Sequence, residues 1–165
     1  MQSSLPPDEL PKDITENFEW KNTGLNNPHF AIRNQMQHLH QRHFSLADAR
    51  RTLAEIAPLV EELVLLKRKL DERGYDIYRH QYFGGSGPDG EKVYPPEVER
   101  LVALAQELDS RGILIKDLEQ GLIDFPHVRE KGDEVYLCWK LGEKDIGFWH
   151  RIPDGFAGRR EIEEL

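Results

Sequence analysis

The side chains best suited to chemistry gather between positions 121 and 160 of the chain. His150 carries an imidazole that titrates near neutral pH, so it could act as an acid, a base or a ligand. Cys138 is the only cysteine, and its thiol would become a nucleophile if a base such as His150 lay beside it. Asp124 stands in an apolar run, where a carboxylate must turn outward or find a strong partner. Any functional site is therefore expected in this part of the chain.

Two arginines near the end of the chain, Arg159 and Arg160, are the partners expected for Asp124. An arginine and a carboxylate form a strong bidentate pair. The first interpretation is a structural clamp that ties the end of the chain to the strand carrying Asp124. The second is a pocket for a small anionic ligand, lined by Asp124, Trp149, His150 and Arg159, with Arg160 beside it.

Two other patterns that resemble functional motifs are too incomplete to predict a site. His38, His40 and His43 match no single face of a helix, and no acid or cysteine stands immediately beside them, so we expect adventitious metal binding at most. The segment 84–87 is rich in glycine but lacks the Lys-Ser/Thr ending and the preceding strand of a phosphate loop. The sequence therefore predicts no metal ion and no cofactor.

The composition of the chain narrows the classes of partner. A net charge of −8 argues against nucleic acid and against an anionic membrane surface. The longest apolar runs are far too short to span a bilayer, and the first residues do not resemble a secretory signal. A single cysteine fits a reducing compartment. We expect a cytoplasmic protein whose partner is a second copy of itself or another protein.

Two segments of the chain have the periodicity of amphipathic helices. The first begins at Ser45, which can cap it, and extends to Gly74, with one apolar stripe and a kink expected from Pro58. Residues 84–92 form a loop rich in glycine. The second helix begins at the prolines 95–96 and ends at Gly112. The simplest arrangement is a long antiparallel helical hairpin.

After Gly112 the apolar period changes to two, which predicts strands over 113–116, 122–125, 134–141 and 145–152. A tight turn at 142–145 would pair Leu141 with Ile146 in a hairpin. One face of the hairpin then holds Val135, Leu137, Trp139, Leu141, Ile146, Phe148, His150 and Ile152, and covers the helices. The other holds Tyr136, Cys138, Lys140, Trp149 and Arg151. This register separates Cys138 from His150, so we expect Cys138 to be a small buried apolar residue and not a nucleophile.

The chain is expected to contain one domain, residues 44–160, between two extensions. Residues 1–43 are polar and lack a sustained period, which predicts a disordered or loosely ordered extension. Met36 is a second candidate for the native start of the protein. Residues 161–165 are expected to be a short acidic tail.

Residues 43–160 resemble a bacterial family catalogued as domain of unknown function 2203. The resemblance is carried by the strings 44–49, 121–126, 135–143, 147–150 and 155–159, which are long enough to be specific. The family often has a proline shortly after the arginine at position 159, where this chain has Glu161. Family members begin near the position of Phe44, which supports Met36 as the start. The resemblance implies a small α+β protein and brings no catalytic residue, cofactor or substrate.

Taken together, these patterns predict an α+β domain in which the helical hairpin packs on one face of a small antiparallel sheet. The absence of a complete catalytic motif favours a non-catalytic interaction or regulatory module, which would self-associate through the hairpin. The alternative is a small enzyme, or a protein that binds a small anion, with its pocket at Asp124, Trp149, His150 and Arg159.

Overall fold

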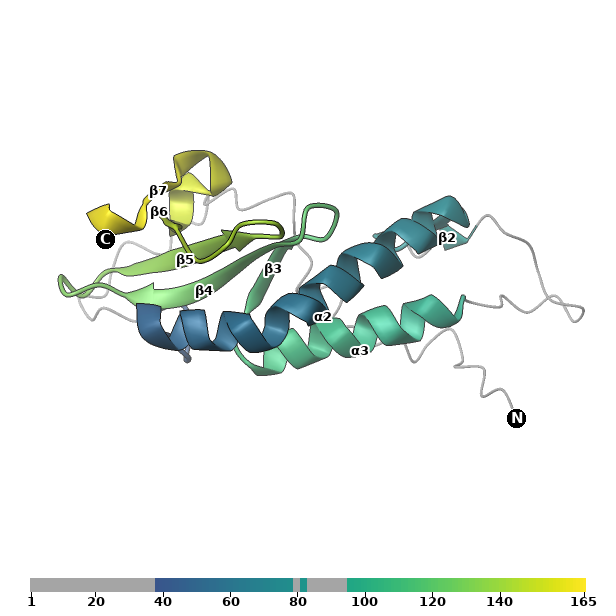
Figure 1. Ribbon diagram of the computed structural model, residues 1–165, viewed down its shortest axis with the longest axis horizontal. Coiled ribbons are helices and arrows are strands. Elements are labelled where there is room, and N and C mark those ends of the chain that lie inside the picture. Colours follow the sequence, from purple (N-terminus) through teal and green to yellow (C-terminus); the bar gives the residue numbers. More distant parts are fainter. Residues whose placement is uncertain (1–37, 79–80, 83–94) are drawn as a thin grey trace, which may run out of the picture.

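The computed structural model describes residues 38–78, 81–82 and 95–165, which form two α-helices and a five-stranded antiparallel sheet. The predicted α+β fold is confirmed. In Figure 1 the helices lie on one side of the sheet, and the end of the chain lies on the other. The predicted loop 84–92 and the Met36 start lie outside the described residues.

The first helix, α2, spans Leu46–Glu72 and has 27 residues. Its predicted cap is confirmed, because the Ser45 side chain accepts a hydrogen bond from the Asp48 amide. Pro58 lies inside the helix, and Figure 1 shows that α2 bends along its length. The helix ends before Gly74, whose φ of 74° is a left-handed conformation that glycine adopts without strain. None of the described helices is long and apolar enough to cross a membrane.

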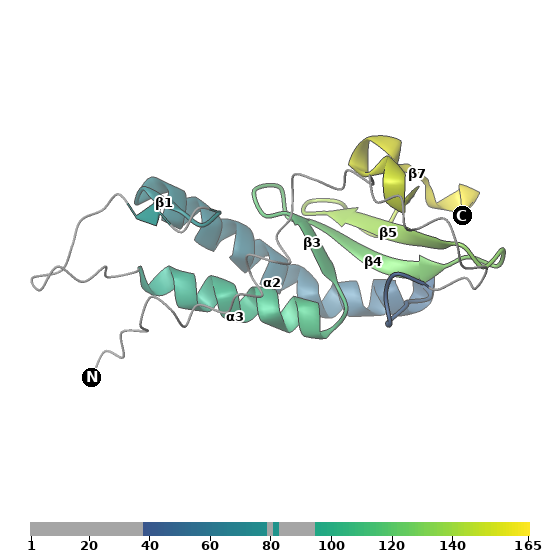
Figure 2. The same cartoon turned by 180° about the vertical axis from the view of Figure 1, so that it is seen from behind.

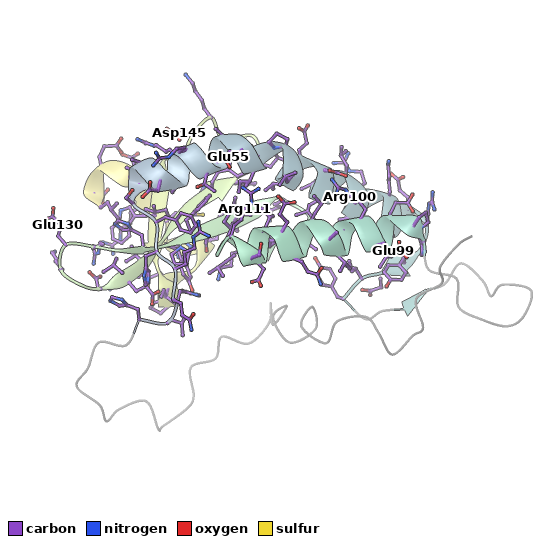
Figure 3. The ribbon with its side chains drawn as sticks, turned by 90° about the horizontal axis from the view of Figure 1, so that it is seen from below. Glu55, Glu99, Arg100, Arg111, Glu130 and Asp145 are labelled. Atoms are coloured by element: carbon purple, nitrogen blue, oxygen red, sulfur yellow. The ribbon has the colours of Figure 1, made fainter. Side chains whose placement is uncertain are left out.

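The second helix, α3, spans Pro96–Ser110 and has 15 residues. Three ion pairs show that it returns along α2 in the opposite direction: Arg73–Glu97, Glu62–Arg100 and Glu55–Arg111. Figure 3 shows Arg111, at the end of α3, beside Glu55 of α2. The two helices are unequal in length, and Figure 2 shows that they extend past the sheet at one end.

The sheet has the order β3-β4-β5-β6-β7, so every strand pairs with the next one along the chain. The bounds are Leu114–Asp117 for β3, Leu122–Val128 for β4, Glu134–Lys140 for β5, Phe148–Arg151 for β6 and Arg160–Glu161 for β7. The first four correspond to predicted strands, and β7 was not predicted. A separate two-stranded sheet joins β1, Tyr75–Asp76, to β2, Gln81–Tyr82.

The sheet has two faces of different composition. The helix face belongs to the main hydrophobic core with the helices and consists of Ile123, Phe125, Leu137, Trp139 and Trp149. The outer face, formed by the alternate residues of the same strands, consists of Asp124, Tyr136, Cys138, Phe148 and His150. Most of these outer-face residues are buried as well, and only Phe148 is intermediate. The three central strands, β4, β5 and β6, therefore place buried side chains on both sides of the sheet.

The predicted register of the last hairpin is wrong by one residue. Leu137 pairs with Trp149 and Cys138 with Phe148, whereas the sequence predicted that Leu137 faces His150. The cause is the connection between β5 and β6, which is not a tight turn but the segment 141–147, anchored where the Trp139 indole donates to the Glu143 carbonyl. A shift of one residue moves every side chain of a strand to the opposite face. Trp149 therefore lies in the core, and His150 joins Cys138 on the outer face.

Both ends of the described chain pack on the sheet. Residues 38–44, here called the N-terminal strap, are fixed at one end by hydrogen bonds from the Phe44 amide to Pro126 and from the His127 ring to the Phe44 carbonyl. Residues 161–165 were expected to be a short acidic tail. Within them, Glu161 pairs with Phe148 in the sheet, and Ile162 and Leu165 pack against the core.

Candidate functional site

Three neighbouring strands bring Asp124, Cys138 and His150 together on the outer face. Asp124 on β4 pairs directly with Cys138 on β5, and His150 on β6 pairs with Tyr136, two residues before Cys138. One ligand atom from each of the three side chains lies within 4.8 Å of the other two. Because hydrogen-bonded strands fix the backbone positions, this cluster is held by rigid elements and not by loops.

His150 is bound at both ring nitrogens. Its Nε2 lies 3.1 Å from the Asp124 carboxylate, and its Nδ1 lies 2.9 Å from the Arg151 carbonyl oxygen. Burial lowers the pKa of His150, but the hydrogen bond and the negative charge of Asp124 outweigh burial and raise it. Both partners are acceptors, so these two hydrogen bonds favour the doubly protonated form of the His150 ring.

Cys138 is fully buried, at 0% exposure. Burial, and after it the charge of Asp124, raises the pKa of the thiol well above its usual range. The Arg159 guanidinium lies 3.9 Å from the sulfur, close enough to donate a weak hydrogen bond. In this environment the thiol stays protonated near neutral pH, so Cys138 is not a ready nucleophile despite the proximity of His150.

The Asp124 carboxylate is incompletely satisfied. The residue is 1% exposed, and its Oδ1 has no hydrogen-bond partner in the part of the chain that the structure describes. Its Oδ2 lies 3.1 Å from His150 and 4.0 Å from the Lys116 ammonium. A buried carboxylate oxygen without a hydrogen-bond partner is costly, so this oxygen is available to a ligand or a solvent molecule.

Two cations flank the cluster from opposite edges of the sheet. On β3, the Lys116 ammonium lies over the Tyr136 ring, 4.5 Å from its centroid. Ahead of β7, the Arg159 guanidinium is stacked between two phenylalanines, Phe148 and Phe156, at 4.2 and 4.3 Å. Glu143 accepts a hydrogen bond of 2.8 Å from the same guanidinium. Arg159 is therefore held in one position beside Cys138.

A family model matches most of the chain, including the strands that carry the cluster. The model described as "Uncharacterized conserved protein (DUF2203)" matches residues 42–162, well over half of the chain. The chain belongs to the DUF2203 family. The predicted resemblance is thus confirmed, and the match includes Asp124, Cys138 and His150. Searches of curated proteins and of solved structures found no match. Membership of DUF2203 assigns no activity, so the chemistry must be inferred from the geometry.

Two of the predicted contacts of this DUF2203 protein are wrong. Asp124 is not clamped by an arginine, because its partner is His150, whereas Arg159 binds Glu143. Cys138 and His150 are not on opposite faces, because the register differs by one residue. Of the predicted pocket residues, Asp124 and His150 contact each other, and Arg159 approaches them only through Cys138.

Trp149 and Arg160, two further predicted site residues, lie away from the cluster. Trp149 is 1% exposed on the helix face, and Arg160 stacks over its ring at 5.4 Å. Arg129 stacks over the same ring at 4.7 Å. These contacts are typical of cation–π packing at the border of a core. Of the predicted site residues, Asp124, His150 and Arg159 therefore belong to the outer face. Trp149 belongs to the core, with Arg160 stacked on it.

The histidines of the N-terminal strap bind a different carboxylate. Glu134 accepts hydrogen bonds from the backbone amides of Leu39 and His40 and lies 2.8 Å from the His43 ring. The His40 ring lies 2.7 Å from the Tyr136 hydroxyl, and the Tyr136 ring meets His150 edge-on. The strap therefore reaches the outer face beside the cluster. No local sequence signal predicts these contacts, because each joins residues more than 90 positions apart.

The donor atoms of the cluster suit a transition-metal ion. Zinc is bound by cysteine sulfur, histidine nitrogen and carboxylate oxygen at about 2.0–2.3 Å, which separates tetrahedral donors by roughly 3–4 Å. The cluster provides one donor of each kind within 4.8 Å, so small side-chain rotations would bring them to that spacing. Asp124 has an oxygen with no other partner, and the Arg151 carbonyl can hold His150 through Nδ1. The residues therefore fit a metal ion that the sequence did not predict.

Proposed function

We propose that this DUF2203 protein binds a divalent transition-metal ion, zinc in the first instance, through Asp124, Cys138 and His150. The observation that carries the proposal is the convergence of three different donor types within 4.8 Å, one of them a buried carboxylate with an unpaired oxygen. A cluster of carboxylates alone would suit magnesium or calcium, whereas thiolate and imidazole favour zinc and similar metals.

A bound cation would remove the electrostatic conflicts of the metal-free cluster. The dication would replace the proton on Nε2 of His150, pair with the free oxygen of Asp124 and bind Cys138 as a thiolate. It would also reverse the effect that burial and Asp124 have on the thiol, because a nearby positive charge favours the deprotonated form. The Arg159 guanidinium, 3.9 Å from the sulfur, is a suitable hydrogen-bond donor to a thiolate.

Three protein ligands leave a fourth position of a tetrahedral ion open, which is typical of catalytic or ligand-exchanging centres rather than structural ones. This proposal develops the predicted alternative of a small enzyme or anion-binding protein. It retains Asp124, His150 and Arg159, adds Cys138 and removes Trp149. A cytoplasmic location stays a prediction, and a reducing compartment would keep the Cys138 thiol available to a metal.

The predicted interaction module stays a second candidate, in which α2 and α3 act as a long helical hairpin that binds a second copy or another protein. Leu65 on α2 and Tyr78 after it are 47% and 45% exposed, so the hairpin does present large apolar side chains. Sedimentation of Leu65→Glu against the wild type would test self-association. A dimer that dissociates in the variant would support it, and a monomeric wild type would contradict it.

The metal proposal is tested on protein purified without a histidine tag. Inductively coupled plasma mass spectrometry should find one equivalent of zinc per chain after loading and dialysis. Cys138→Ser and His150→Gln should lose it, because each removes one donor at nearly constant volume. His38→Gln is the matched control, since His38 is an exposed histidine of the strap whose ring contacts the Gly132 carbonyl and the His43 ring but, within the described residues, none of the three proposed ligands. It should keep the full zinc content.

Two further measurements separate loss of the metal from loss of the fold. Cobalt loading should give a thiolate-to-cobalt charge-transfer band that Cys138→Ser abolishes while its circular dichroism stays native. Zinc at 100 times its Kd should stabilise the wild type by about 2.7 kcal/mol, and the folded variants much less. Stoichiometric zinc in folded Cys138→Ser, or no saturable binding in the wild type, would show that the proposal is wrong.

A further inference from the structure

We propose that the open position of the metal ion takes a small singly charged oxyanion, a carboxylate or dihydrogen phosphate, which Lys116 and Arg159 hold from either side. This inference rests on the proposed metal centre and names the class of ligand that it would bind. Two observations support it: the positions of the Lys116 and Arg159 side chains, and the net charge of the cluster with a metal ion bound.

The sheet determines the direction in which the open position points. Asp124, Cys138 and His150 all belong to the outer face, so three donors approach the ion from the sheet. In a tetrahedral ion the fourth position lies opposite the plane of the other three. The fourth ligand is therefore on the side of the ion away from the sheet, in the layer that contains the ends of the Lys116 and Arg159 side chains.

Two cationic groups border that layer. The Lys116 ammonium lies 4.0 Å from Oδ2 of Asp124, and Nη1 of Arg159 lies 3.9 Å from the sulfur of Cys138. They approach from opposite edges, since Lys116 is on β3 and Arg159 precedes β7 in the order β3-β4-β5-β6-β7. A ligand above the ion would lie between them.

The two cations differ in how firmly they are held. Arg159 is stacked between Phe148 and Phe156, and its side chain is only 16% exposed. Lys116 has a side chain that is 37% exposed, so its ammonium can follow a ligand that enters from solvent. An enclosed guanidinium and a partly exposed ammonium together suit an oxyanion, because guanidinium groups bind oxyanions with directional N–H bonds and an ammonium acts as a point charge.

The net charge of the cluster predicts a single negative charge on the ligand. A divalent ion would balance the Asp124 carboxylate and the Cys138 thiolate. Arg159 is balanced by Glu143, its partner at 2.8 Å. Lys116 has no ion pair in the described chain other than the one with Asp124, whose charge the metal would take. The positive charge of Lys116 is then left unbalanced at the border of the buried cluster, so a monoanion is the favoured fourth ligand.

The experiment uses the full chain loaded with cobalt and titrated with inorganic phosphate, and separately with acetate. Binding at the metal should change the visible spectrum of cobalt and saturate. Lys116→Met should weaken the binding about tenfold or more, since a hydrogen bond to a charged group is lost. Arg159→Lys, which keeps the charge but loses the planar donor, should weaken it less than Arg159→Met.

Lys140→Met is the matched control for charge alone. Lys140 follows Cys138 by two residues on the same face of β5, and its ammonium lies 5.9 Å from the Phe156 ring. Its removal should change the anion affinity less than twofold, well below the tenfold expected for Lys116→Met. If both variants weaken binding equally, the anion follows the general charge of the surface, and the inference is wrong.

The remaining outcomes distinguish this inference from the metal proposal. Cobalt binding with no spectral response to either anion would overturn the oxyanion site and leave the metal centre standing. Phosphate that binds equally well to metal-free protein would also overturn it, because the ion would not be the binding partner. Failure to bind cobalt or zinc would overturn both. A response to phosphate but not acetate would support the inference and assign the ligand to the phosphate class.

Discussion

The two faces of the sheet are built from the same strands and are both largely buried. The helix face carries apolar side chains, whereas the outer face carries polar and titratable ones. On β4, Phe125 of the helix face is 0% exposed and its neighbour Asp124 of the outer face is 1% exposed. The helix face is covered by α2 and α3, whereas the outer face is covered by the N-terminal strap and by the segment that carries Arg159. Burial alone therefore does not distinguish the hydrophobic core on the helix face from the candidate site on the outer face.

The difference lies in what each face gains from burial. Apolar side chains on the helix face gain about 25 cal/mol for each Å² removed from water. On the outer face, burial of Asp124 and His150 carries a desolvation penalty that opposes their mutual attraction. A protein retains such groups at a cost in stability when they have another use, which is the physical reason to place the site on the outer face.

The largest expected effect is the removal of a core ring from the helix face. Phe125→Ala should lower the free energy of unfolding by about 3–5 kcal/mol, because Phe125 is fully buried and packs edge-on against Phe44 at 5.3 Å. Phe148→Ala is the matched change on the outer face and should cost less, since Phe148 is only partly buried. Urea denaturation measures both. An equal or larger loss in Phe148→Ala would break the comparison between the faces.

The next largest effect concerns the buried pair of the outer face. In metal-free protein, Asp124→Ala should destabilise the fold by about 3 kcal/mol, because it leaves His150 buried without its anion. The double variant Asp124→Leu/His150→Leu should recover most of that loss or exceed wild-type stability, while losing zinc binding. Denaturation and metal analysis of the same samples give both values.

The double variant is the sharper of the two tests. If it is as unstable as Asp124→Ala, the polar pair is needed for the fold, and the outer face would be a second structural core. If it is stable but still binds one zinc, the ion lies elsewhere. Only a stable double variant that binds no zinc supports the inference that Asp124 and His150 serve to bind the metal and not to stabilise the fold.

The sequence predicted the helices well because their signals are local. Ser45, Pro96 and the left-handed glycines Gly74 and Gly112 mark the ends of α2 and α3 in the sequence and in the structure. The alternation along β4 and β5 also assigned Asp124 and Cys138 to positions where the chain does form strands. Elements whose capping and periodicity lie within a few residues can be predicted in this way.

The site could not be predicted because it depends on the register between β5 and β6, and the sequence of β6 is ambiguous. In β6, Phe148, Trp149 and His150 are all large, so neither face is clearly the apolar one. The turn geometry that would decide depends on Glu143, which holds the connection through the Trp139 indole. The N-terminal strap was missed for a related reason. Its structure comes from a distant carboxylate, Glu134, and not from any period of its own.

A smaller effect, on the cover of the outer face, is expected from pH. Burial lowers the pKa of His40, although the charge of Glu134 opposes it. A lowered pKa means that the released strap binds the proton more readily than the docked one. Docking is therefore strongest above the ordinary histidine value of 6.5 and weakens as the pH falls below it. Protons should loosen the strap without unfolding the helix face.

Glu134 acts in the same direction at lower pH. Burial favours its neutral form, but hydrogen bonds from His43 and from the strap amides outweigh burial and lower its pKa. Its contribution is present above its ordinary value of 4.5 and is lost as the pH falls through the lowered one. Both groups thus predict a strap that loosens in acid.

Hydrogen exchange of metal-free protein at about pH 7.5 and about pH 5.5, corrected for intrinsic rates, measures this loosening. Amides of residues 39–44 should lose protection at the lower pH, while those of α2 keep theirs. His40→Gln should reduce the difference, because glutamine does not titrate in this range. Greater protection of the strap at the lower pH would contradict the assigned role of His40.

The smallest effect is expected from an ion pair that is exposed. Glu55 and Arg111 join α2 to α3 at 3.1 Å, with side chains 64% and 35% exposed. Glu55→Gln should cost only about 0.2–1 kcal/mol, because water already solvates both charges and Arg111 keeps Glu107 as a partner. A double-mutant cycle with Arg111→Gln gives the coupling energy, which about 1 M salt should abolish.

The loss of stability in Asp124→Ala should persist in the same salt, since the pair of Asp124 and His150 is shielded from solvent. A coupling energy for the exposed pair that matches the loss in Asp124→Ala would mean that charge pairing, and not burial, sets the stability difference. The outer face would then need no ligand to account for its polar side chains.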